Sequence, residues 1–285
     1  MVASALFLSL FATICFGAAT FLSSKSAKDM GSLQTLFFFQ LLGLPADLLL
    51  LPFAPRTVHI DLLPIILVGL YMTVSMLVWF YALKVGNVSI VSPATESYSL
   101  LSVLLGIFFL HESVGILKGI GIILIFVGVL CIGLNFSSLK KSKRVEFYTG
   151  IPLAFLYAIL LAVFYLFTTF LARTDGWFVT AFGLRVVIII GSFVLLILQG
   201  KSFKQIFSHV PWAWIGAAGF LDGLGFSIFT LALTFSQVSY VAVIASTQSL
   251  VTVFLAYFFY KERLKLYQIV GLVGVIVGLI FLQLH

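Results

Sequence analysis

The chain of 285 residues has a hydrophobic fraction of 62%, a charged fraction of only 9% and a mean hydropathy of +1.23. Because a water-soluble domain has about 25% charged residues, this composition excludes an ordinary soluble protein and predicts an integral membrane protein. The net charge of +7 does not indicate a nucleic-acid partner, because the basic residues lie in loops between apolar segments, where they set membrane orientation.

The apolar segments predict an all-α membrane protein with about ten membrane-spanning helices, because one bilayer crossing needs about 20 apolar residues. In chain order, the expected spans are 3–23, 32–53, 61–84, 88–110, 114–134, 148–171, 177–199, 211–235, 238–260 and 265–283. The first segment has no basic residues in front of it and similar segments follow, so we interpret it as a span and not as a cleaved signal peptide. The short loops leave no room for a separate soluble domain.

One polar linker, at residues 135–147, divides the chain almost in half and contains four basic residues, Lys140, Lys141, Lys143 and Arg144. Counted over alternating loops, twelve Lys and Arg residues fall on one side of the membrane and three on the other. The positive-inside rule then predicts a cytoplasmic linker and chain termini that both face outward. We expect the membrane to be a plasma membrane of the prokaryotic type.

The sequence contains an internal repeat. Shifted by 150 residues, positions 82–112 lie over 232–262 with about 12 identities in 31 positions, and the identical residues include serines and a glutamate. We therefore expect two repeats, 1–134 and 148–285, with five spans each. Because five is an odd number, the second repeat enters the membrane upside down. Inverted repeats are typical of secondary transporters that open a central site alternately to the two sides of the membrane.

Each repeat ends in a serine-rich span, a short loop with Glu112 or Glu262, and a helix with regularly spaced glycines. This pattern resembles the EamA repeats of the drug/metabolite transporter superfamily over nearly the whole chain. The resemblance implies ten helices around a central cavity and substrates that range from amino acids and amines to sugars and nucleotide sugars. It also implies that Glu112 and Glu262 are the family's loop glutamates. We expect each carboxylate to interact with the positive N-terminus of the span that follows it.

Four charged residues lie inside apolar spans, where even a lenient scale gives a cost of about 2.5 to 3.5 kcal/mol for a charge at the bilayer centre. They are Asp47, Glu96, Arg185 and Asp222. Asp47 lies near the end of its span, where we expect the membrane interface to solvate it. The other three have no charged residue at the equivalent position of the other repeat, and Glu96 corresponds to Ser246. We therefore predict that Glu96, Arg185 and Asp222 form the functional site.

Glu96 is expected deep in the hydrocarbon region, shortly after Pro93. A proline inside a helix removes a backbone hydrogen bond and frees carbonyl groups, so we interpret Pro93 as a structural hinge beside a binding surface. Arg185 cannot lose its charge and needs an anion nearby. Asp222 and Glu96 are the alternative partners.

Aromatic and polar side chains near these charges predict the walls of a small-molecule pocket. The predicted lining residues are Tyr71, Trp79, Tyr98, Ser246 and Gln248. The leading hypothesis is a secondary transporter for a small polar or zwitterionic, amino-acid-like metabolite, in which Arg185 binds a carboxylate and Glu96 or Asp222 binds an ammonium group or a coupled proton. The alternative is a carrier for organic cations or amines, with Glu96 and the aromatic rings binding the cation and Arg185 serving as a structural counter-ion.

Other functions have less support in the sequence. It contains no G-x-x-x-x-G-K-[ST], H-E-x-x-H or G-x-S-x-G motif, so we expect neither an ATP-driven pump nor an enzyme. Cys15 and Cys131 have no metal-ligand spacing, and no metal or cofactor is expected. A structural or channel-forming membrane protein remains an alternative. Besides the bilayer and a small-molecule substrate, the sequence suggests a homodimer through the glycine-rich spans 114–134 and 265–283.

Overall fold

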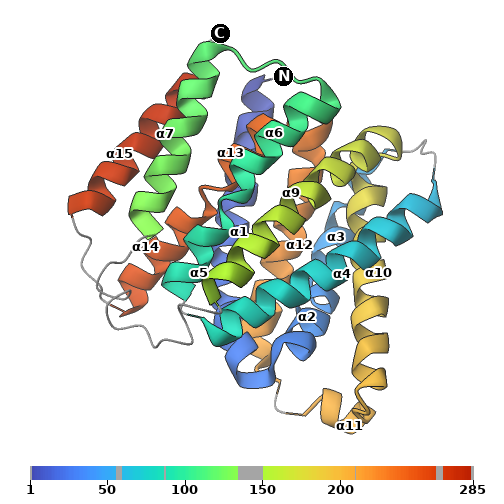
Figure 1. The fold of residues 1–285 in the computed structure, drawn as a ribbon. Helices are drawn as coiled ribbons and strands as arrows, with labels where there is room; N and C mark the ends of the chain where they lie inside the picture. Colours follow the sequence, from blue (N-terminus) through green and yellow to red (C-terminus); the bar gives the residue numbers. More distant parts are fainter. Residues whose placement is uncertain are drawn as a thin grey trace.

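The protein is almost entirely helical in the part of the chain that the computed structural model describes, which is 2–55, 60–86, 88–133, 150–208, 210–260 and 266–283. The predicted linker at 135–147 and the loop glutamate Glu262 lie outside the described residues. The helices pack into one bundle, with the first half of the chain interleaved with the second (Figure 1).

The described helices correspond to the ten predicted spans. The first half contains α1 (Val2–Met30), α2 (Ser32–Leu41), α3 (Leu44–Leu50), the 3-10 turn η1 (Leu51–Phe53), α4 (Leu62–Val85), α5 (Val88–Thr95), α6 (Tyr98–Leu110) and α7 (Ile116–Gly133). The second half contains α9 (Ile151–Thr174), α10 (Trp177–Leu198), the short α11 (Phe203–Ile206), α12 (Trp212–Phe235), α13 (Val238–Ala245), α14 (Gln248–Tyr260) and α15 (Leu266–Gln283). Three predicted spans are interrupted: α2 with α3 and η1, α5 with α6, and α13 with α14.

The composition of these helices fits a lipid environment. Six helical stretches of the described chain, each of 22 to 26 residues, are long and apolar enough to cross a membrane, and four shorter apolar helices accompany them. Large apolar side chains face outward along the bundle, for example Phe7 and Ile116, which are 71% and 85% exposed. In lipid such exposure is favourable, because the solvent is itself apolar. The predicted fold class, an all-α membrane protein of two five-helix repeats, is confirmed.

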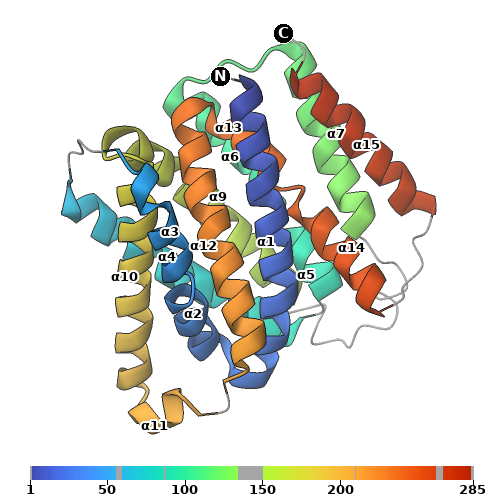
Figure 2. The same ribbon diagram turned by 180° about the vertical axis from the view of Figure 1, so that it is seen from behind.

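The contact between α7 and α15 shows that the two repeats are inverted. A Cβ added to Gly121 would lie 2.8 Å from the carbonyl oxygen of Gly278, and one added to Gly128 would lie 2.6 Å from the carbonyl oxygen of Gly271. The residue numbers rise along α7 while they fall along α15, so the two equivalent helices are antiparallel (Figure 2). Only glycine permits this close approach of two backbones.

The same glycines bear on the predicted homodimer. Gly121, Gly128 and Gly278 pack within the chain, so their small size is already explained without a second copy. Additional Cβ atoms at Gly115 and Gly119 would meet nothing within 4 Å. The homodimer remains a prediction.

Both serine-rich spans break at the same repeat position. In the first repeat, α5 ends at Thr95 and α6 begins at Tyr98. In the second repeat, α13 ends at Ala245 and α14 begins at Gln248, in each case 150 residues later. Short hydrogen bonds from hydroxyl groups satisfy carbonyl groups near the breaks, including Thr95 Oγ1 to Ser92 O at 2.6 Å and Thr247 Oγ1 to Ile244 O at 2.7 Å. Irregular backbone at membrane depth needs such partners.

The second break occurs without a proline, because Val243 stands where the first repeat has Pro93. Proline is therefore not required for the interruption of these spans. The role of Pro93 as a hinge remains a prediction.

Glu112 binds a different helix from the one that was expected. Its carboxylate accepts hydrogen bonds from the backbone N–H groups of Val238 and Ser239 at 2.7 and 3.1 Å, and from the Ser239 hydroxyl at 2.5 Å. It therefore caps α13 of the second repeat, and the predicted interaction with the span that follows it, α7, is wrong. The residue before Glu112, His111, ends α6 with a left-handed backbone, at φ of 53°.

Candidate functional site

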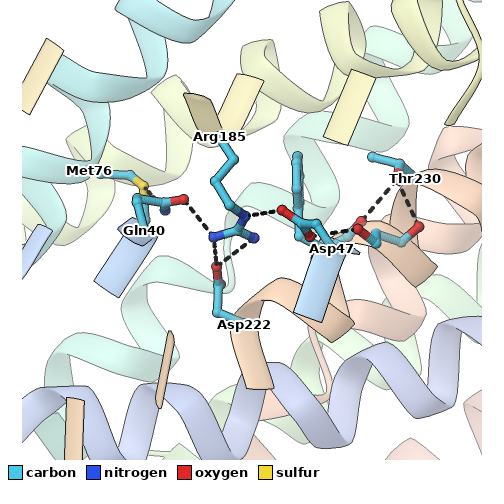
Figure 3. A network of polar contacts seen from close by, with 8 residues as sticks. Gln40, Asp47, Met76, Arg185, Asp222 and Thr230 are labelled. Atoms are coloured by element: carbon cyan, nitrogen blue, oxygen red, sulfur yellow. Dashed lines mark hydrogen bonds and ion pairs between the residues drawn. The ribbon is translucent and has the colours of Figure 1, made fainter. Parts of the chain in front are cut away.

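The centre of the bundle contains a buried ion-pair network around Arg185 of α10 (Figure 3). The guanidinium donates to Asp47 Oδ2 at 2.5 Å through Nε, to Gln40 Oε1 at 2.7 Å through Nη1, and to Asp222 Oδ2 at 3.2 Å through both Nη1 and Nη2. The side chain of Arg185 is 1% exposed. A buried cation is stable only when it is paired in this way.

Glycines allow the guanidinium to reach this position. A Cβ added to Gly43, between α2 and α3, would lie 2.8 Å from Arg185 Cζ. A Cβ added to Gly219 of α12 would lie 2.5 Å from the carbonyl oxygen of Phe39, at the end of α2. The glycine-dense sequence of α12 therefore brings its backbone, and with it Asp222, close to the break between α2 and α3.

Asp47 is the main counter-ion of Arg185, and the expectation that the membrane interface solvates it is wrong. Its side chain is fully buried, and its second oxygen accepts a hydrogen bond from the Ser227 hydroxyl at 2.8 Å. The reason is the interruption of the second span: α3 starts anew at Leu44 and packs against α10 and α12, which turns the first helical turn of α3 inward.

Beside this network lies a central cavity of about 80 Å³, which has space for several water molecules. Its acidic and basic lining residues are Glu96, Arg185 and Asp222, and its polar lining includes Gln40 and Gln248. The three charges that the sequence singled out therefore meet in one cavity, although they come from α10, α12 and the break after α5.

Glu96 lies at that break and is 1% exposed. Its Oε1 accepts a hydrogen bond from Gln248 Nε2 at 3.2 Å, whereas Oε2 is buried and has no hydrogen-bond partner among the described residues. The ion pairs of the described chain join Arg173 to Glu112 and Arg185 to Asp47 and Asp222, so none of them includes Glu96. A buried carboxylate oxygen without a donor is costly, and a bound proton or cation would offset this cost.

Aromatic rings form much of the remaining wall of the cavity. Trp79 and Tyr157 stack with their centroids 5.8 Å apart, and Phe164 and Phe226 stack at 5.9 Å. Phe16, Phe39 and Tyr165 also belong to this lining. Aromatic faces attract cations, and they suit a substrate with a positively charged group.

The predicted lining residues divide into two groups. Trp79 and Gln248 line the cavity. The other three make structural hydrogen bonds and do not line it: Tyr71 donates to Leu160 O at 2.8 Å, Tyr98 to Ala242 O at 3.3 Å, and Ser246 to Val243 O at 2.7 Å. Gln40 and the counter-ion Asp47 were not among the predicted site residues. In this early part of the repeat the shift is 145 residues, which aligns Thr35 with Thr180 and Gln40 with Arg185, and this equivalence was the only sequence signal for Gln40.

Ten membrane spans in two inverted repeats, with ionisable groups gathered in a central cavity between them, define a membrane transporter of the inverted-repeat class. The family model described as the EamA-like transporter family matches residues 3–134 and 148–284. The chain belongs to this family, and it is a membrane transporter of the drug/metabolite transporter superfamily. The resemblance seen in the sequence is thereby confirmed.

A solved structure, titled only "Crystal structure of protein", has the same fold. It superposes with a TM-score of 0.76 over 98% of this chain and 96% of that chain, at 16% sequence identity. At this identity the likeness concerns the fold alone. No curated protein matches the sequence.

Proposed function

We propose that this transporter is a secondary carrier for a small amine-bearing metabolite, whose positively charged group binds Glu96 in exchange for protons. The observation that carries the proposal is the unpartnered carboxylate oxygen of Glu96 in an aromatic cavity. Three acidic residues, Asp47, Glu96 and Asp222, accompany one arginine at this site. The ionised site is therefore short of positive charge, which a cationic substrate supplies.

The exchange follows from the chemistry of one carboxylate. Glu96 can hold either a proton or a substrate cation, but not both at the same oxygen. Loading of the substrate then releases the proton, and the two gradients are coupled. The inverted repeats and the paired helix breaks support alternating access as the mechanism, with the breaks allowing α5 and α13 to tilt against α6 and α14.

A second candidate substrate is a zwitterion of the amino-acid type. The contacts of Arg185 with Asp222 are its longest, at 3.2 Å, and both residues line the cavity. A substrate carboxylate that replaced Asp222 would meet the guanidinium. We favour the simple amine, because Asp47 and Gln40 already satisfy Arg185 with shorter hydrogen bonds.

The proposal is tested in proteoliposomes with an imposed pH gradient and an internal pH-sensitive dye. We expect that adding an amine substrate, found first by thermal-shift screening, moves protons through the native protein and through the Asp29→Asn variant, whose exposed carboxylate lies at the end of α1. We expect no proton movement with Glu96→Gln. Unchanged exchange in Glu96→Gln would contradict the role of this residue.

The two substrate classes are separated without any substitution. A monoamine and the amino acid with the same carbon skeleton differ only by a carboxylate. We expect the amine to be exchanged at the lower concentration, because the carboxylate of the amino acid would face the like charge of Asp222. A marked preference for the amino acid would instead assign the zwitterion.

A further inference from the structure

A second polar recess, away from the central cavity, is lined by residues at the ends of α1, α4 and α10 and the start of α2. These helix ends lie at the end of the bundle that carries α11 (Figure 1). The recess has a volume of about 440 Å³ and opens between the junction of α1 with α2, the last turn of α4 and the residues after α10. Its polar lining residues include Ser32, Gln34, Lys84 and Lys201. We call it the basic recess. By the positive-inside rule, this end faces the cytoplasm.

Two ammonium groups in the basic recess lack an acidic partner. In the described part of the chain no acidic residue lines it, and the ion pairs found there include neither Lys84 nor Lys201. Lys84 Nζ is 3.9 Å from the position that a Cβ on Gly31 would take, which places the ammonium beside the start of α2. Lys201 Nζ donates to Gln34 Oε1 at 3.2 Å.

Gln34 holds this second lysine in place. The Nε2 of Gln34 donates to the carbonyl oxygen of Ile206 at 2.6 Å, and the Gln34 side chain is buried. Its amide is therefore oriented with the oxygen toward Lys201. Lys201 is therefore held by a hydrogen bond to an oriented amide, unlike a surface lysine that contacts only solvent.

The start of α2 adds further hydrogen-bond donors. Gly31 occupies the N-cap position with φ of 88° and gives no side-chain cap, so the first N–H groups of this ten-residue helix have no capping side chain. The Ser32 hydroxyl is buried and has no hydrogen-bond partner in the described part of the chain. Helix N-termini, hydroxyl groups and ammonium groups are the donors with which proteins bind phosphate groups.

The recess also offers apolar contacts. Met30, Leu33, Leu77 and Tyr81 line it, and Tyr81 is 47% exposed on the outer surface of α4. A ligand with a phosphate and an adjoining hydrocarbon chain can use both kinds of wall. Lys84 is specific to the first repeat, since Thr234 stands at the equivalent position of the second repeat.

We propose that the basic recess binds the phosphate of an anionic phospholipid from the cytoplasmic leaflet. Lys84, Lys201, Ser32 and the first turn of α2 hold the phosphate, while Leu77 and Tyr81 contact the start of an acyl chain. This site is separate from the transport cavity, and it does not depend on the identity of the substrate.

The test compares two double variants of the purified full-length chain in neutral detergent. Lys84→Gln with Lys201→Gln removes both ammonium groups from the recess. Lys28→Gln with Lys204→Gln removes two exposed lysines from the same end of the bundle and leaves the recess intact. Binding is measured as the rise in melting temperature during titration with short-chain phosphatidylglycerol, phosphatidylcholine or inorganic phosphate.

We expect phosphatidylglycerol to stabilise the native protein and the control variant at similar concentrations. In the recess variant the apparent Kd rises by roughly 25-fold, since each of the two lysines near an anionic lipid contributes about fivefold. Ser32→Ala, the mildest change, should weaken binding without altering the fold. Equal weakening in both double variants, or no stabilisation by any phosphatidylglycerol concentration, overturns the site. Stabilisation by inorganic phosphate as large as that by phosphatidylglycerol overturns the lipid as its source and assigns a soluble phosphate.

Discussion

The unequal roles of Asp47 and Asp222 can be tested by neutralising each residue in turn. Asp47→Asn removes the charge that accepts the 2.5 Å hydrogen bond from Arg185 and the 2.8 Å hydrogen bond from Ser227. Asp222→Asn leaves an amide oxygen that still accepts the two 3.2 Å contacts, at a side chain that is 15% exposed. Both variants keep the size and shape of the side chain. The comparison therefore isolates the charge.

The expected magnitude follows from the partners that remain. Removing one partner of a buried ion pair costs about 3–5 kcal/mol. Asp222 and Gln40 still contact Arg185 in Asp47→Asn, so we expect the lower end of this range, about 3 kcal/mol. In Asp222→Asn the stronger partner is retained, and we expect about 1 kcal/mol. For a chain of this size, these losses correspond to a decrease in Tm of roughly 6–12 °C and 2–4 °C.

The assay is thermal unfolding in detergent, followed by tryptophan fluorescence. Substrate binding gives an independent measurement, because Asp222 lines the cavity and Asp47 does not. We expect Asp222→Asn to change the apparent affinity for amines and Asp47→Asn to leave it nearly unchanged in the folded fraction. A Tm loss in Asp222→Asn equal to or larger than that in Asp47→Asn would refute the assignment of Asp47 as the main counter-ion.

Two further predictions concern contacts between the repeats. Glu112→Ala should lower the unfolding free energy by roughly 1–2 kcal/mol, because the cap of α13 is lost. The control Asp61→Ala removes the exposed cap of α4 and should lower it less. Equal Tm losses in the two variants would speak against a special role for the buried cap. Gly121→Val should destabilise the protein by about 1–3 kcal/mol, because the new side chain meets the backbone of α15. Gly115→Val should change Tm little in detergent, because a Cβ there meets nothing within 4 Å. Sensitivity at Gly115 alone would indicate an interface with another molecule.

The sequence predicted the spans and the repeat well, because both depend on patterns that are local or fixed by symmetry. Hydropathy located the helices, and the 150-residue shift predicted that the fourth and ninth spans are equivalent. A disruption of the fourth span beside Glu96 was predicted from Pro93, but the equivalent break of the ninth span, which has Val243 in place of the proline, was not, although the serine and threonine residues of both spans carry the signal. Hydroxyl side chains that satisfy nearby carbonyl groups compete with a continuous helix.

Side-chain partners were harder to predict, because they depend on the packing of distant segments. Glu112 and Val238 are 126 residues apart, and nothing in the loop sequence of Glu112 distinguishes α7 from α13 as its partner. Asp47 was misjudged because its depth was inferred from a continuous span that in fact breaks before α3. In contrast, Glu96, Arg185 and Asp222 were placed in one cavity because a charge in an apolar span has few stable surroundings other than one another.

The glycine contacts between α7 and α15 also have a consequence for the transport cycle. Exchanging the two repeats carries the pair Gly121 and Gly278 onto the pair Gly271 and Gly128, so this contact maps onto itself. The contact of α1 with α12 instead maps onto that of α4 with α9, and α1 packs against α12 more extensively than α4 packs against α9. If the halves exchange conformations during transport, the contact between α7 and α15 stays the same. The contact of α1 with α12 then becomes smaller, and that of α4 with α9 becomes larger. A disulfide between α7 and α15 should then permit transport, and one between α1 and α12 should stop it.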